Sequence, residues 1–151
     1  MPDTTNMTEG ERLVKLNETN VAIVRQAIED IGNLNVEGLL AIIDDDVDFR
    51  LMGTSPFSRP IRGKEGYLEI IGEVGSYLDG FIELTVDEMI PAGEWVIVRA
   101  SGHATMKATG ANYDNQYCMM WKLEDGMVVK VREYTCTKLV MEHFFPDQYA
   151  G

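Results

Sequence analysis

In the first half of the chain, apolar positions recur with the period of a helix. One stripe starts after a capping-box pattern at Thr8 and Glu11 and stops at Gly32, which predicts a first helix. Asn35 is a typical N-cap for a short second helix that ends in the acidic residues 44–46. A loop is expected over 53–63, and a third helix over 67–78. The first stripe consists of Leu13, Leu16, Val21, Val24, Ile28 and Ile31.

The second half of the chain changes to the period of two that is typical of strands. Alternation predicts strands over 47–51, 82–86, 95–106, 113–123 and 128–135. The Glu-Asp-Gly sequence at 124–126 predicts a tight hairpin between the last two. Because helices come first and a meandering antiparallel sheet second, we expect an α+β fold.

Composition limits the partners that this chain can have. Its 151 residues include 25 acidic and 13 basic side chains, which leaves a formal charge of −12. This excess makes nucleic acid and anionic membrane surfaces poor partners. We expect a flexible segment over 1–12, one domain over 13–146 and a tail over 147–151. The absence of an export signal in residues 1–12 predicts a cytoplasmic protein, in which Cys118 and Cys136 are free thiols.

Strand 113–123 is apolar on both faces. Alternation places Cys118 and Met120 on one side and four larger side chains on the other. One face should cover the helices, and the second predicts a homodimer formed through the sheet. The alternative is that the C-terminal residues Met141, Phe144 and Phe145 cover that second face. The four larger side chains are Tyr117, Met119, Trp121 and Leu123.

The motifs of several chemistries are missing. The sequence has no nucleotide-binding glycine loop and no hydrolase nucleophile elbow. His103 and His143 are its two histidines, and neither has a second ligand at metal-binding spacing, so we expect no metal and no cofactor.

Polar side chains on otherwise apolar strands are the remaining candidates. If the sides that carry them coincide, they line an apolar cavity of the kind that binds small molecules. Taken singly, each of them could be a structural residue with its hydrogen bonds satisfied. They are Arg99, Ser101 and His103 on one strand, Asn115 and Tyr117 on the next, and Tyr134 and Cys136 on the last.

Four segments resemble the SnoaL-like (ketosteroid-isomerase-like) proteins of the nuclear-transport-factor-2-like superfamily. They are a helix with a Gly-Asn turn over 21–35, LLAIIDDDVDF over 39–49, RGKEG over 62–66, and NYDNQYCMMWKLEDGMVVKVREYTCTKLV over 112–140. The resemblance implies a cone-shaped, curved antiparallel sheet wrapped around about three N-terminal helices, a cystatin-like α+β barrel with a deep pocket. It also implies chemistry without cofactors.

Two positions depart from the family's catalytic patterns. The cyclases carry an acid–base aspartate in a Tyr-x-Asp motif, where this chain has Cys136. The epoxide hydrolases use an Arg-x-Asp pair, which here is Arg99-Ala100-Ser101. Neither mechanism therefore transfers directly.

We therefore expect an enzyme that uses acid–base chemistry on a small hydrophobic carbonyl, hydroxyl or epoxide compound. His103 is the candidate acid or base, because imidazole titrates near neutral pH. Tyr117 and Tyr134 complete the candidate catalytic set as hydrogen-bond donors. Two alternatives stay open: a non-catalytic protein that binds a small molecule, and a scaffold whose cone is filled by its own side chains. The candidate substrate-binding residues are Arg99, Asn115, Cys136, Asp48 and Met119.

Overall fold

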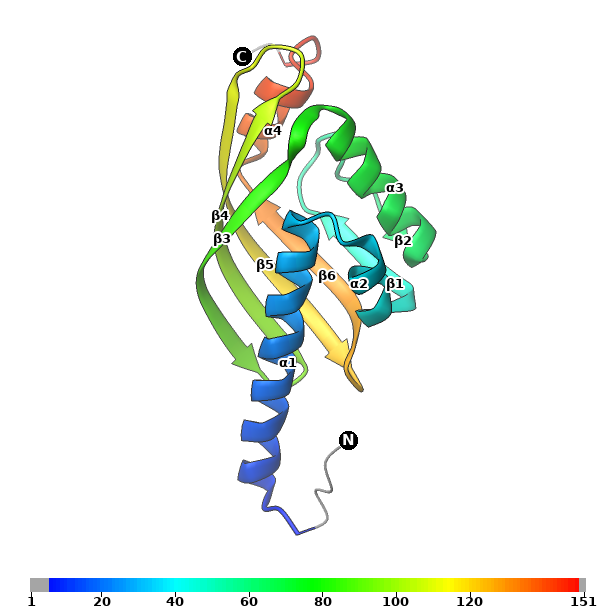
Figure 1. Ribbon diagram of the computed structural model, residues 1–151, viewed down its shortest axis with the longest axis vertical. Coiled ribbons are helices and arrows are strands. Elements are labelled where there is room, and N and C mark those ends of the chain that lie inside the picture. The colour runs from blue at the N-terminus through cyan, green and yellow to red at the C-terminus, as the bar shows by residue number, and fades with distance from the viewer. Residues whose placement is uncertain (1–5, 150–151) are drawn as a thin grey trace.

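Six strands form one curved sheet in the computed structural model, which describes residues 6–149 (Figure 1). The elements in chain order are α1 (Glu9–Gly32), α2 (Val36–Ile42), β1 (Ile43–Leu51), β2 (Ile61–Arg62), α3 (Gly63–Ser76), β3 (Leu78–Ala92), β4 (Trp95–Met106), β5 (Asn112–Glu124), β6 (Met127–Thr135) and α4 (Thr137–Phe144).

The strand order is β2-β1-β6-β5-β4-β3, and all neighbours are antiparallel except β1 and β6. The predicted α+β cone is confirmed, but the sheet is mixed and open rather than wholly antiparallel. Helix α3 and four strands, β2 to β5, separate β1 from β6 in the chain. The chain can therefore return to run parallel beside β1, which a short hairpin does not allow.

Helices α1, α2 and α3 cover the inner, concave face of the sheet (Figure 1). Strand alternation turns Val96, Val98 and Ala100 of β4 toward them, and all three are buried. Helix α1 is attached to the β3–β4 turn by two asparagines. Asn20 donates to the Gly93 carbonyl at 2.9 Å, and the Gly93 amide donates to Asn17 Oδ1 at 2.8 Å.

The beginning of α1 differs from the prediction. The helix starts at Glu9, inside the segment expected to be flexible, with Thr8 and Glu11 forming the predicted capping box. Its first turns extend beyond the sheet (Figure 1), so Leu13 and Leu16 of the predicted apolar stripe are exposed. Residues 1–5 and 150–151 lie outside the described residues. No helix within 6–149 is both long and apolar enough to cross a membrane.

The C-terminal helix closes one end of the cone from inside. Phe57, in the loop after β1, packs edge-on against Phe144 at 5.2 Å and Phe145 at 4.8 Å between ring centroids. Phe144 also packs against Tyr113 of β5, at 5.0 Å. The C-terminal aromatic residues therefore belong to the inner core, and the alternative in which they cover the outer face is wrong.

The close approach between Gly102 and Tyr117 gives a test of this packing. A Cβ at Gly102 would lie 2.6 Å from the Tyr117 ring and 3.0 Å from Ile82. We therefore expect Gly102→Ala to lower the free energy of unfolding by about 1–3 kcal/mol in urea titrations. Gly72→Ala, on helix α3, is the matched control, because a Cβ at Gly72 would have no atom within 4 Å. Equal stability of the two variants would contradict the close packing.

Candidate functional site

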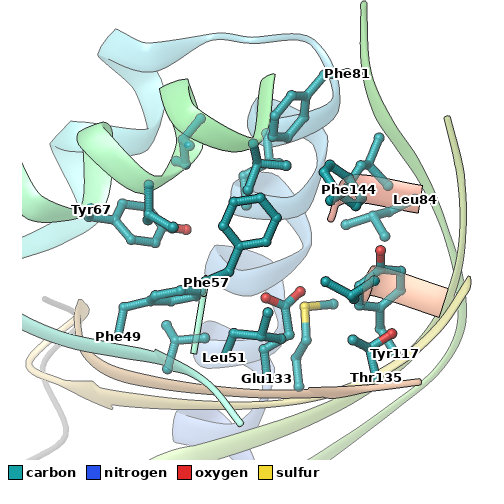
Figure 2. Close-up of a pocket in the computed structure, with 18 of the residues that line it drawn as sticks. Phe49, Leu51, Phe57, Tyr67, Phe81, Leu84, Tyr117, Glu133, Thr135 and Phe144 are labelled. Atoms are coloured by element: carbon teal, nitrogen blue, oxygen red, sulfur yellow. The ribbon is translucent and has the colours of Figure 1, made fainter. Parts of the chain in front are cut away.

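A cavity of about 110 Å³ lies between the inner face of the sheet and helices α3 and α4 (Figure 2). A cavity of roughly 150 Å³ holds benzene in another protein, so this smaller one limits a ligand to about one ring. The cavity contradicts a cone completely filled by its own side chains. Eight of its 20 lining residues are aromatic: Phe49, Phe57, Tyr67, Phe81, Tyr113, Tyr117, Trp121 and Phe144.

Glu133 is the one carboxylate among the lining residues. It belongs to the inner side of β6, together with Val131 and Thr135, and is half-buried. Figure 2 shows its carboxylate pointing into the cavity between Leu51 and Tyr117. Burial raises the pKa of Glu133 to about 7, because little solvent reaches the charged form. Near neutral pH, this carboxyl can therefore either accept or donate a proton.

No opposite charge compensates Glu133 inside the cavity. The lining residues include no lysine, arginine or histidine. Within 6–149, the carboxylate also takes part in no ion pair or hydrogen bond. Its proton-accepting oxygens are therefore available to a ligand.

Tyrosine hydroxyls approach the cavity from two directions. On β5, the Tyr117 hydroxyl donates to the Tyr113 oxygen at 3.4 Å, and Asn115 Nδ2 donates to the same oxygen at 2.8 Å. From α3, Tyr67 directs its oxygen toward the cavity (Figure 2). Burial raises the pKa of all three tyrosines, which therefore stay protonated and able to donate hydrogen bonds.

Three of the predicted site residues lie on the inner face. Tyr117 and Met119 line the cavity, as alternation along β5 predicted. Asn115 shares their side of the strand and is buried. It does not line the cavity, but reaches it through its hydrogen bond to Tyr113.

His103 and Arg99 do not reach the cavity, so their expected convergence with Tyr117 is wrong. Both project from the outer face of β4, where His103 pairs with Asp114 and Arg99 pairs with Glu88. Their side chains are 51% and 57% exposed. The reason is that the other side of β4 carries small and apolar residues that pack under the helices.

Tyr134, Cys136 and Asp48 also lie away from the cavity, contrary to expectation. Tyr134 alternates with Glu133 and is 45% exposed. Cys136 is exposed at the N-cap of α4. Asp48 accepts two hydrogen bonds from Arg132, at 2.9 and 3.2 Å, and these lower the pKa of Asp48.

Some of these outer residues meet in a wide groove next to α4. His103, Ser101 and Cys136 line it together with Asp114 and Asn115. A second groove contains Arg99 and Tyr134. Within 6–149, no three His, Cys, Asp or Glu side chains gather closely enough to hold a metal ion.

Glu133, Tyr113 and Tyr67 are the site residues that the sequence prediction missed. Two of them carried a usable signal. Tyr113 has the same parity as Asn115 and Tyr117, so the rule that placed those two also places Tyr113. Glu133 has the same parity as the apolar residue Val131 on β6, so alternation places both on one side of the strand. Tyr67 carried no such signal, because the sequence placed it only at the start of the third helix, predicted over 67–78.

Comparisons with known proteins agree with this architecture. Residues 24–131 match the family model described as SnoaL-like domain. No curated protein matches the chain significantly.

Several solved structures have the same fold at low sequence identity. An NTF2-like protein of unknown function from Burkholderia pseudomallei superposes with a TM-score of 0.76 and 22% identity, over 84% of this chain and 98% of the other. A protein proposed to be a SnoaL-like polyketide cyclase, from Jannaschia, has a TM-score of 0.75 and 16% identity, over 85% and 92%. TerC, co-crystallized with polyporic acid, has a TM-score of 0.74 and 20% identity, over 83% and 97%.

The raised pKa of Glu133 predicts a pH-dependent stability. Between pH 4.5 and about 7 the folded protein keeps a proton that the unfolded chain releases, so stability falls as the pH rises. We expect the loss to reach at most about 3 kcal/mol, and Glu133→Gln to abolish it. Urea titrations at pH 5 and pH 8 measure the difference. Glu69→Gln, on the exposed side of α3, is the control. A Glu133→Gln variant with the wild-type pH dependence would contradict the assignment.

Proposed function

The chain belongs to the SnoaL-like domain family of the NTF2-like superfamily, and from this premise we propose that it is a cofactor-independent acid–base enzyme. Its substrate is a small, largely apolar carbonyl, hydroxyl or epoxide compound that binds in the inner cavity. The name of the Jannaschia protein and the ligand crystallized with TerC support a small-molecule site in this fold.

One observation carries this proposal: the apolar cavity holds a single carboxyl, that of Glu133, with no ion-pair partner in the part of the chain that the structure describes. Burial raises its pKa to about 7. A general base works best when its pKa lies near the operating pH. Glu133 removes a proton from a carbon or oxygen of the substrate and later returns it. This role replaces the one expected for His103.

The tyrosines supply the second requirement of such a reaction. Removing a proton beside a carbonyl leaves negative charge on the carbonyl oxygen, which a donor placed in advance stabilises. The Tyr113–Tyr117 pair and Tyr67 offer such donors in a site with little competing water. Proton removal and charge stabilisation therefore use different sides of the same cavity.

A non-catalytic binding protein is the second candidate function. The position of the cyclase aspartate holds Cys136, which lies outside the cavity. A chain without a catalytic group could still bind a small molecule in its aromatic cavity. The two candidates differ in whether a bound ketone exchanges its protons.

We also propose that the outer face of the sheet pairs two copies of the chain. Trp95, Ile97 and Met120 are half-buried apolar residues that β4 and β5 contribute to this face. Each side of the face has an excess of one charge, so a two-fold axis would bring unlike charges together. Strands β1 and β6 carry Arg50, Lys130 and Arg132 beside Asp48, while β3 to β5 carry Glu83, Asp87, Glu88 and Asp114 beside Arg99 and Lys122.

Deuterium exchange tests the catalytic proposal without a known substrate. Cyclohexanone in D₂O should exchange the protons beside its carbonyl faster with the protein than without it, as followed by NMR. We expect the rate to rise with pH and level off above about 7, when Glu133 is ionised.

Glu133→Gln should lower that exchange rate by about 100-fold or more, because it removes the base. Glu69→Gln should leave it unchanged. If wild-type protein binds cyclohexanone but exchanges it no faster than buffer, the binding-protein alternative replaces the enzyme.

Sedimentation velocity tests the dimer. We expect the wild-type chain to sediment as a dimer and Met120→Arg, which adds a charge among the apolar residues of the outer face, to sediment as a monomer. Gln148→Arg adds the same charge on the exposed C-terminal turn and should leave the dimer intact. A monomeric wild type, or a dimeric Met120→Arg variant, would rule out this interface.

A further inference from the structure

The hydrogen bonds around Asn115 fix the orientation of its amide group. Asn115 is buried, and its Oδ1 accepts from the backbone amides of Gln116 at 2.8 Å and Cys136 at 3.2 Å. Both partners can only donate, so the oxygen of the side chain must face them. The Nδ2 group therefore faces the other way, and donates to the Cys136 carbonyl at 3.1 Å and to the Tyr113 hydroxyl at 2.8 Å.

This orientation decides what the Tyr113 hydroxyl can do. Its oxygen accepts one hydrogen bond from Asn115 and a second from Tyr117. A hydroxyl oxygen has two acceptor positions, and both are now occupied. The proton of Tyr113 therefore needs an acceptor elsewhere, and no residue within 6–149 accepts it. Tyr113 is one of the residues that line the cavity, so a ligand bound there could accept this proton.

We propose that Asn115 is a positioning residue that holds the Tyr113 hydroxyl as a donor aimed into the cavity. The inference rests on the proposed function only in taking this cavity as the ligand site. It specifies the ligand further: the group that meets Tyr113 is a hydrogen-bond acceptor, such as a carbonyl or ether oxygen. Two donated bonds also polarise the Tyr113 oxygen, which strengthens its own O–H as a donor.

The hydrogen bonds of Asn115 to Cys136 explain how it can orient the Tyr113 hydroxyl. Asn115 joins the first part of β5 to the junction between β6 and α4, through both the amide and the carbonyl of Cys136. The same contacts that attach α4 to the sheet therefore set the polarity of the tyrosine pair. A substitution must preserve shape if it is to separate the two effects.

Asn115→Asp keeps the shape and reverses the polarity. At pH 8 the new carboxylate still accepts from both backbone amides, but has no proton to give Tyr113. The tyrosine then turns its own proton toward the carboxylate and away from the cavity. Gln116→Glu is the matched control, since it makes the same amide-to-carboxylate change at the next residue, on the exposed side of β5.

The measurement is the infrared carbonyl stretch of cyclohexanone bound to the protein, because a donated hydrogen bond lowers that frequency. We expect lowered frequencies with wild type and Gln116→Glu, and a clearly smaller lowering with Tyr113→Phe or with Asn115→Asp at pH 8, in which Tyr113 no longer donates. Acidification should restore the shift in Asn115→Asp, since a protonated carboxyl can donate again. Glu133 also takes up a proton near pH 7 and faces the same cavity, so the change with pH in Asn115→Asp is compared with that in wild type. A purely structural role for Asn115 would give both proteins the same pH dependence.

The outcomes separate this inference from the proposed function. A lowered frequency without deuterium exchange would support the positioning role and contradict catalysis. An unchanged shift in Asn115→Asp or Tyr113→Phe would overturn the inference, as would the absence of bound cyclohexanone in wild type. If Asn115→Asp does not fold, Asn115→Ala should give a broadened carbonyl band, because the Tyr113 hydroxyl is then free to rotate. A carbonyl band in Asn115→Ala that is as sharp as in wild type would also overturn the inference.

Discussion

Strand β6 is hydrogen-bonded along both edges, and this double pairing decides which side chains enter the cavity. Glu133 lies opposite Leu51 of β1 on one edge and opposite Met119 of β5 on the other. A slip of one residue would turn Tyr134 inward and Glu133 outward. The register on two strands therefore creates the desolvated carboxyl, because it surrounds Glu133 with apolar neighbours.

Periodicity predicted well which residues of one strand share a face, and poorly which faces of different strands meet. Tyr117 and Met119 were placed correctly, because alternation within β5 is a local property. His103 and Tyr134 were placed wrongly, because polar residues were assumed to face the cavity. On β4, the small residues Ala100 and Gly102 occupy the inner face, and Gly102 contacts the Tyr117 ring. A polar row on an amphipathic strand more often marks its exposed side.

The limits of the helices and the sheet depend on tertiary contacts that local patterns do not contain. The apolar stripe of α1 continues through Leu13, yet the sheet ends before that turn. The acidic residues 44–46 look like the end of a helix, but belong to β1, which begins at Ile43. Pairing with β6 overrides the local sequence preference here, because Ile43 lies opposite Val128 of β6.

The same ionisation links stability and function in this cavity. Glu133 must lose its proton to act as a base, and burial without a partner opposes that loss. A lysine or arginine beside it would stabilise the charged form, but would lower its pKa and weaken it as a base. The basic side chains near Glu133 in sequence, Lys130 and Arg132, instead occupy the outer face, where Arg132 pairs with Asp48. Separating the cations from the cavity keeps the carboxyl poised near neutral pH, at the cost of stability once it ionises.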